Sequence, residues 1–248
     1  MIGVYDSGVG GLAVLRHLRP LLPDADLLYL ADQAHMPYGA RSLQEVRSLA
    51  EQSVTTLLGR GASAVVIACN TASAAALQHL RDRFEVAIVG MEPAVKPAAA
   101  ATRTGKVAVL ATPTTFQGAV MEQLIGRYAA GIEVIAHPCP GWADAIEESW
   151  PEGAAAEVTG HLTPLVASGV DTIVLACTHY SFISDVIQDA AGPGVTVIDP
   201  APAVARQASR VADGAGTGST TYLTTADPVR FAERIERLLG ERVVAERA

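Results

Sequence analysis

The 248-residue sequence has few basic residues and no basic cluster. Its 18 lysines and arginines are outnumbered by 26 aspartates and glutamates, which gives a formal net charge of −8. The basic residues are scattered along the chain, whereas nucleic-acid-binding proteins gather them in one block or on one face. The composition therefore gives no support for a nucleic-acid partner.

Long apolar runs are also missing. No stretch approaches the roughly 18 consecutive apolar residues that a membrane-spanning helix requires. The opening segment "MIGVYDSGVGG" lacks the charged region and the extended apolar region of a secretory signal. We expect no membrane association and a cytoplasmic location.

Cysteine is scarce, with only Cys69, Cys139 and Cys177. An odd number at wide spacing disfavours a disulfide framework. The sequence contains no CxxC or HxxxH spacing, so we also expect no metal centre. The three cysteines are expected to be reduced thiols.

Aromatic residues make up only 5% of the chain, but half of it is hydrophobic and 18% is charged. Such a composition supports a real core and argues against disorder. Short apolar runs that favour strands occur at 2–5, 27–31, 64–68, 86–89, 107–110, 132–136, 171–175 and 195–198. Most are continuously apolar, as in parallel strands buried on both faces. Helical patterns between them, at 11–19 and 42–58 for example, predict an α/β fold.

The predicted strands form two sets of four. An offset of about 105 to 109 positions lays "GVYDSG" on "AVLATP", "LLYLAD" on "EVIAHP", "GASAVVIAC" on "GVDTIVLAC" and "VAIVGMEPAV" on "VTVIDPAPAV". Four matches in the same order indicate an internal repeat. We predict two pseudo-symmetric, doubly wound domains with mainly parallel sheets and a site in the cleft between them.

The C-terminal tail does not fit a third repeat. Residues 221–225 favour a strand, and "DPVRFAERIERLLG" favours a helix with Asp227 as N-cap, Pro228 at its first position and Gly240 at its end. We expect the tail to complete the first domain. The predicted domains are therefore 1–95 plus 206–248, and 96–205.

A glycine-rich loop follows the first predicted strand. Gly8, Gly10 and Ala13 satisfy G-x-G-x-x-A, and Asp32 follows near the next strand, as in a dinucleotide fingerprint. Two other interpretations are a backbone site for a small anion such as a carboxylate and a simple tight turn. Asp6 would oppose a nearby pyrophosphate, so we favour the small-anion interpretation.

Two cysteines end equivalent segments, "VIACNTAS" at 66–73 and "VLACTHYS" at 174–181. Each follows a strand and precedes residues that cap helices, a position that lowers the pKa of a thiol. If the two halves face each other, Cys69 and Cys177 lie on opposite sides of one cleft. One thiolate can then remove a Cα proton while the opposite thiol supplies another, which inverts a stereocentre without a cofactor. Asp6 and His179 are placed to tune these thiols.

Taken singly, each cysteine is also compatible with a small buried hydrophobe. The repeat argues against that interpretation for the pair. Nucleophilic catalysis by one thiol is a rival that leaves the second cysteine unexplained. We assign a structural role to the remaining cysteine and histidines: Cys139, His17, His35, His79, His137 and His161.

Several motifs together resemble the glutamate racemase family, within the aspartate/glutamate racemase superfamily. They are "GVYDSGVGGLAVL", "PYGARS", "VVIACNTAS", "EPAVKPA", "LATPTT", "LACTHY" and "LTTADPVRFAERIERLLG", and they occur in order along nearly the whole chain. The resemblance implies an isomerase that needs no cofactor and interconverts L- and D-glutamate for peptidoglycan synthesis, usually as a homodimer.

The resemblance also implies site residues. The catalytic set comprises Cys69, Cys177, Asp6, His179 and Glu147. The substrate-binding set comprises Ser7, Tyr38, Gly39, Asn70, Thr71, Thr112, Thr115 and Thr178.

Two segments depart from the family pattern. Ser181 and Phe182 replace a usual Pro-Leu, and "CPGWADAIE" at 139–147 replaces a more apolar stretch. We expect these changes to affect the cleft entrance. They leave open an aspartate or broader amino-acid racemase, and a silent amino-acid-binding homologue. A dinucleotide-dependent oxidoreductase is the rival at the level of fold.

Overall fold

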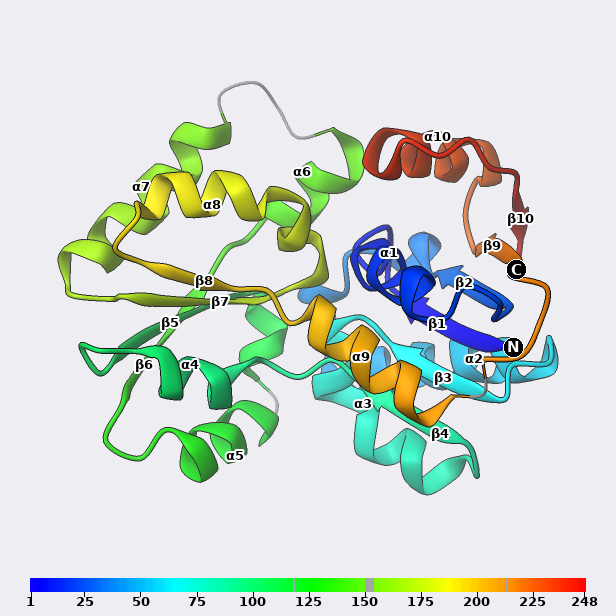
Figure 1. The fold of residues 1–248 in the computed structure, drawn as a ribbon, viewed down its shortest axis with the longest axis horizontal. Coiled ribbons are helices and arrows are strands. Elements are labelled where there is room, and N and C mark those ends of the chain that lie inside the picture. Colours follow the sequence, from blue (N-terminus) through cyan, green and yellow to red (C-terminus); the bar gives the residue numbers. More distant parts are fainter. Residues whose placement is uncertain (118, 150–153, 213) are drawn as a thin grey trace.

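The computed structural model describes residues 1–248 except 118, 150–153 and 213, and two parallel β-sheets organise it. The first sheet has the order β10-β9-β2-β1-β3-β4 and the second has the order β6-β5-β7-β8. Figure 1 shows the two sheets side by side, each covered by helices. We refer to each sheet with its helices as the first half and the second half.

The strands lie close to the predicted apolar runs. In the first half they are β1 (Ile2–Asp6), β2 (Leu27–Ala31), β3 (Ala64–Ile67), β4 (Ala87–Gly90), β9 (Thr220–Thr224) and β10 (Ala245–Arg247). In the second half they are β5 (Lys106–Ala111), β6 (Glu133–Pro138), β7 (Thr172–Ala176) and β8 (Thr196–Ile198).

The predicted repeat is confirmed by the order of the strands. The segment β2-β1-β3-β4 of the first sheet has the same order as β6-β5-β7-β8 of the second. The residues after β3 and β7 are therefore equivalent, and so are those after β1 and β5. The α/β fold with two similar parallel sheets is confirmed.

Helices cover both faces of the first sheet. They are α1 (Leu12–Leu21), α2 (Leu43–Gly59), α3 (Asn70–Arg83), α9 (Ala201–Val211) and α10 (Pro228–Leu239). Alternate residues of β1 point to opposite faces: Ile2 and Val4 pack with α1, α9 and α10, and Tyr5 packs with α2 and α3. This alternation is why the strand is apolar along its whole length.

The second half is built in the same way. Its helices are α4 (Val95–Ala101), α5 (Ala119–Tyr128), α6 (Trp142–Glu148), α7 (Ala154–Ala167) and α8 (Ser184–Ala191). One core cluster lies under α6, α7 and α8, and another lies under α4 and α5. The described residues also form short 3₁₀ turns: η1 (Gln33–His35) and η2 (Tyr38–Ala40) between β2 and α2, η3 (Pro113–Phe116) after β5, and η4 (Thr178–Ile183) after β7.

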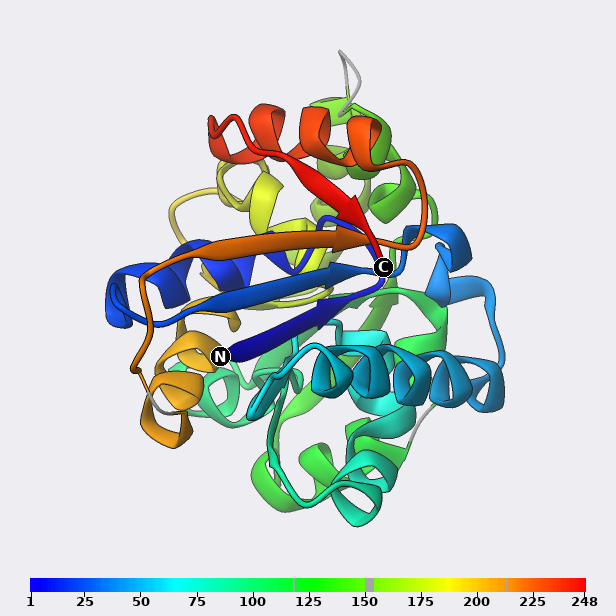
Figure 2. The same ribbon diagram turned by 90° about the vertical axis from the view of Figure 1, so that its right-hand side faces the viewer.

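The C-terminal tail joins the first sheet, as expected from the sequence. Strand β9 pairs with β2, and β10 pairs with β9 at the edge of the sheet (Figure 2). The Asp227 side chain accepts hydrogen bonds from the first turn of α10, and Gly240 ends the helix with a φ of 72°. Strand β10 was not predicted. The domain boundaries near residues 95 and 206 stay a prediction.

No helix in the described part of the chain is both long and apolar enough to cross a membrane.

Candidate functional site

A cavity of about 160 Å³ lies where the carboxyl ends of the two sheets meet. Ser7 follows β1, Cys69 follows β3, Thr112 follows β5 and Cys177 follows β7, and all four line the cavity. The complete lining is Ser7, Met36, Pro37, Tyr38, Gly39, Ala40, Cys69, Asn70, Thr71, Thr112, Pro113, Cys139, Pro140, Gly141, Ala143, Asp144, Cys177, Thr178 and His179. Ligands of open α/β sheets bind at such an edge.

Cys69 is the N-cap residue of α3. Its Sγ accepts a hydrogen bond from the backbone N–H of Ala72 at 3.4 Å and lies 3.7 Å from Ser7 Oγ. Burial, with a further contribution from the charge of Asp6, raises the pKa of Cys69 to about 12. The predicted lowering of this pKa is wrong, because desolvation of the thiolate outweighs the helix N-terminus.

Cys177 occupies the equivalent position in the second half, but its surroundings differ. The 3₁₀ turn η4, rather than an α-helix, follows it, and its side chain caps no backbone N–H. Its Sγ lies 3.7 Å from Nδ1 of His179, and the residue is 7% exposed. The sulfur of Cys177 therefore has a histidine as its neighbour, whereas the sulfur of Cys69 has the N-terminus of α3.

His179 connects Cys177 to a buried carboxylate. Its Nε2 lies 2.9 Å from Oε1 of Glu147, and Arg234 Nη1 lies 3.1 Å from the other oxygen of Glu147. Burial lowers the pKa of His179, but hydrogen bonds and charge from Cys177 and Glu147 outweigh it and raise that pKa well above its usual value. Burial raises the pKa of Glu147, but His179, the Val9 N–H and Arg234 together lower it. Both directions favour an imidazolium–carboxylate pair.

Asp6 lies behind the cavity lining and links the two halves. Its Oδ1 accepts the Gly8 N–H at 2.8 Å, and its Oδ2 accepts the hydroxyl of Thr178 at 3.0 Å. Burial raises the pKa of Asp6, although His179 and the hydrogen bonds oppose this. Asp6 is therefore a fully buried carboxyl group that acts on Cys69 through its charge.

The glycine loop is occupied by side chains of the protein itself. The Val9 N–H donates to Oε1 of Glu147, and a Cβ atom added at Gly8 would overlap the same oxygen. A Cβ at Gly10 would overlap the Thr178 hydroxyl. The loop therefore binds internal carboxylates and leaves no space for the pyrophosphate of a dinucleotide. Asp32, the other part of that fingerprint, accepts the hydroxyl of Tyr38.

Three threonine hydroxyls form a cluster at one side of the cavity. Thr71 Oγ1 lies 3.0 Å from Thr112 and 3.3 Å from Thr115, and Thr112 and Thr115 are 3.0 Å apart. Thr71 and Thr112 line the cavity, whereas Thr115 lies behind them. Hydroxyls arranged in this way offer donors to a carboxylate.

Asn70 supplies a polar atom that has no hydrogen-bond partner among the described residues. Its Nδ2 donates to Met91 Sδ at 3.0 Å, while Oδ1 is buried and unpaired. An unpaired buried acceptor at a cavity wall costs free energy unless a ligand donates to it.

Tyr38 and Gly39 line the cavity without offering it the tyrosine hydroxyl. That hydroxyl donates to Asp32 and accepts from Tyr5. The Gly39 carbonyl accepts the hydroxyl of Thr114 at 2.7 Å, which joins η2 of the first half to η3 of the second. These two residues shape the wall through their backbone and ring.

Sequence reasoning missed part of this site. Arg234 reaches Glu147 from the tail helix α10, and Gln33 Nε2 donates to the same carboxylate at 3.0 Å. Asp144 lines the cavity, as does Cys139, for which sequence reasoning predicted only a structural role. No local motif joins these residues, because their positions depend on how the two halves meet.

The Ser181–Phe182 departure lies outside the cavity lining. The Ser181 hydroxyl donates to Asp199 at 2.9 Å, and the Phe182 ring lies under the guanidinium of Arg16 at 5.2 Å. The expectation that this pair affects the cleft entrance stays a prediction. In the other departing segment, Asp144 does line the cavity.

A model of the Asp/Glu/Hydantoin racemase family matches residues 12–208. The chain belongs to this family. Among curated relatives, the glutamate racemase of Roseiflexus sp. (strain RS-1) is 48% identical over 249 residues, which cover 96% of this chain and 91% of the relative. That of Herpetosiphon aurantiacus is 45% identical and covers 94% of this chain and 95% of the relative.

Solved structures of racemases in this family share the whole fold. Glutamate racemase RacE1 of Bacillus anthracis superposes with a TM-score of 0.89 at 31% identity, covering 100% of this chain and 97% of that one. The Escherichia coli enzyme, solved with L-glutamate and the activator UDP-MurNAc-Ala, has a TM-score of 0.87 at 30% identity, covering 99% and 96%. The family resemblance inferred from the sequence is confirmed.

Proposed function

We propose that the protein is a glutamate racemase that interconverts L- and D-glutamate without a cofactor. The observation that carries this proposal is that Cys69 and Cys177, at equivalent positions of the two halves, line one cavity. Relatives named glutamate racemase at 43–48% identity over most of the chain support the choice of substrate.

The proposed reaction uses one thiol on each face of Cα. One cysteine, as thiolate, removes the Cα proton and becomes a thiol, and the electron pair remains on the carbanion. The opposite cysteine gives its proton to the other face and becomes a thiolate. The reverse reaction exchanges the two roles, so no net proton is consumed.

Cys69 needs help to ionise, since its pKa is raised to about 12. We propose that the ammonium group of the substrate supplies the missing positive charge as it enters the cavity. Asn70 Oδ1, buried and without a partner among the described residues, suits an ammonium donor. Ser7 Oγ, 3.7 Å from the sulfur, can donate a hydrogen bond to the thiolate.

Cys177 is supported by a charged histidine. The raised pKa of His179 favours its protonated imidazole, which can donate a hydrogen bond from Nδ1 to the sulfur of Cys177, 3.7 Å away. Glu147 and Arg234 hold that imidazole in place. We propose Asp6 and His179 as assistants of the two thiols, with Glu147 as the residue that positions His179.

The two carboxylates of glutamate require donors. We propose the hydroxyls of Thr71 and Thr112 as donors to them, with Thr115 completing the threonine cluster from behind. Thr178 lines the proposed substrate shell, while its hydroxyl donates to Asp6. Ser7, Asn70 and the wall formed by Tyr38 and Gly39 complete the proposed substrate shell. An aspartate racemase is the alternative, and it would need the same donors closer together.

The biological setting is also proposed. D-Glutamate made by such an enzyme supplies peptidoglycan synthesis, which places the protein in the cytoplasm. We likewise propose that the protein forms a homodimer.

Incubation with L-glutamate in D₂O, with no cofactor added, tests this function. We expect optical rotation to decay while deuterium enters Cα, and we expect L-aspartate to react far more slowly. Activity confined to aspartate would replace the proposed substrate. Tight binding of glutamate with neither exchange nor loss of rotation would show a silent homologue.

A further inference from the structure

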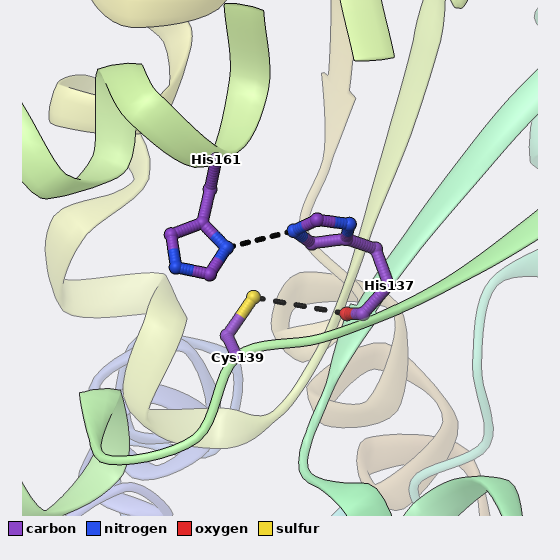
Figure 3. Close-up of side chains that lie close together, drawn as sticks. All are labelled: His137, Cys139 and His161. Atoms are coloured by element: carbon purple, nitrogen blue, oxygen red, sulfur yellow. Dashed lines mark hydrogen bonds between the residues drawn. The ribbon is translucent and has the colours of Figure 1, made fainter. Parts of the chain in front are cut away.

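Three side chains that commonly ligate metals lie together beside the cavity. His137 is near the end of β6, Cys139 follows that strand, and His161 lies on α7. Their ligand atoms, one from each residue, all lie within 4.8 Å of one another. Figure 3 shows the side chains pointing toward one another, with His137 Nε2 at 2.8 Å from His161 Nδ1.

Imidazole nitrogen and thiolate sulfur are the donors that zinc-class metals prefer. In tetrahedral coordination, with metal–nitrogen bonds of about 2.0–2.1 Å and a metal–sulfur bond of about 2.3 Å, the donor atoms lie about 3.3–3.6 Å apart. The two nitrogen atoms would therefore separate by about half an ångström, and the sulfur would move closer by about 1.2 Å at most. Rotations of the side chains can supply changes of this size.

The surrounding structure holds the three residues in place. The Trp142 ring packs edge-on against His161, with centroids 5.2 Å apart, and the Tyr180 hydroxyl donates to the Cys139 carbonyl at 3.0 Å. Cys139 is 1% exposed, whereas the two histidines are half-buried, so an ion can reach them from solvent. These contacts hold the backbone of Cys139 and the ring of His161, as outer-shell partners do around metal ligands.

We propose that His137, Cys139 and His161 bind one divalent ion of the zinc class. The three residues supply three ligands and leave the fourth position to water, as in open zinc sites. On binding, the Cys139 thiol releases its proton to solvent as the sulfur–metal bond forms, and the ion replaces the hydrogen bond between the two imidazoles.

This inference goes beyond the proposed racemisation and does not depend on it. Cys139 also lines the cavity, so the metal site and the proposed active site share a wall. The expectation of no metal centre was based on local CxxC and HxxxH spacing. His161 comes instead from a separate helix, which no local pattern reveals.

Cobalt(II), a spectroscopic substitute for zinc, tests the site in a Cys69→Ser/Cys177→Ser background, where the cavity thiols cannot compete. We expect one ion per chain and a sulfur-to-cobalt charge-transfer band. His161→Gln in that background should weaken cobalt binding by at least about tenfold. The matched control is His79→Gln, because His79 is a similarly exposed histidine whose Nε2 instead lies 2.7 Å from Glu51.

Zinc binding is also titrated by calorimetry, including in Cys139→Ser in the same background. Circular dichroism verifies that the variants are folded. Loss of binding in His161→Gln and Cys139→Ser, with retention in His79→Gln, supports the site. Absence of the charge-transfer band, or equal affinity in all variants, overturns it. If His161→Gln fails to fold, Cys139→Ser alone is the test: loss of metal binding in this variant supports the site, and unchanged affinity overturns it.

Discussion

His179 is the residue whose surroundings say most about how Cys177 is activated. It lies between a thiol at 3.7 Å and a carboxylate at 2.9 Å, and it is fully buried. Burial alone would favour the neutral imidazole, but hydrogen bonds and charge from Cys177 and Glu147 outweigh it and raise the pKa of His179. The charge of His179 therefore depends on Glu147.

Replacing Glu147 with Gln should lower the pKa of His179, because the variant loses the negative charge that faces Nε2. A raised pKa in the folded state stabilises the protein below pH 6.5, which is the pKa of the imidazole in the unfolded chain. This stabilisation is lost as pH rises through the pKa of His179 in the folded protein. In Glu147→Gln that loss should occur at lower pH. An NMR titration of the His179 ring, assigned with His179→Gln, measures the shift.

The matched control is Glu148→Gln, since Glu148 also pairs with Arg234 but is 77% exposed. Its effect on the His179 titration should be small. An unchanged or raised pKa of His179 in Glu147→Gln would contradict the proposed role of Glu147.

At the residue scale, the sequence predicted the positions of both cavity thiols but not their ionisation. The repeat places Cys69 and Cys177 after equivalent strands, and this was visible in the spacing of the two motifs. The raised pKa of Cys69 was not visible, because it results from packing around the sulfur and from Asp6. Local sequence carries no information on desolvation.

At the scale of elements, α10 holds α6 in place. Figure 1 shows the two helices next to each other. Arg237 donates to the backbone carbonyls of Ile146, Glu147 and Glu148 in the last turn of α6. Cations stabilise that end of a helix. The tail helix thereby positions the carboxylate that contacts His179.

Arg237→Ala should lower the free energy of unfolding by about 1 kcal/mol, because it removes the hydrogen bonds from Arg237 to these carbonyls. It should also reduce racemase activity, since α6 carries Glu147. Denaturant unfolding and initial rates measure the two effects. Arg242→Ala is the control, as Arg242 is 88% exposed and pairs with Glu236 on the same segment. Equal effects of the two variants would contradict the role given to Arg237.

The sequence predicted α10 well, including Asp227 at its start and Gly240 at its end. Such caps are local signals. Strand β10 was missed because its three residues, "AER", carry no apolar pattern and form a strand only by pairing with β9. The contact between α10 and α6 was missed for the same reason, as it depends on the meeting of the two halves.

At the scale of the whole molecule, the two halves are joined by polar contacts around the cavity. Glu147 of the second half accepts the Val9 N–H of the first, and Thr178 donates to Asp6. Gly8 allows this close approach because it has no Cβ. The repeat predicted that the two halves share one topology, but it did not predict these contacts between the halves.

Gly8→Ala should disturb this junction, because the added methyl group overlaps the Glu147 carboxylate. We expect a loss of about 1–3 kcal/mol in stability and a marked loss of activity. The control is Gly160→Ala, in the middle of α7, where an added Cβ meets no atom within 4 Å. That variant should be neutral or more stable by up to about 1 kcal/mol. Thermal unfolding that ranks the two variants in the opposite order would contradict the account.

Hydrogen exchange at Cα by the two single variants, Cys69→Ala and Cys177→Ala, tests the central claim most directly. Each is incubated in D₂O with L-glutamate and, separately, with D-glutamate. We predict that racemisation falls by at least about 10²–10⁴-fold in both. Residual exchange should be confined to one enantiomer in Cys69→Ala and to the other in Cys177→Ala. Exchange of the same enantiomer by both variants, or near-normal racemisation by either, would contradict the placement of the two thiols on opposite faces of the substrate.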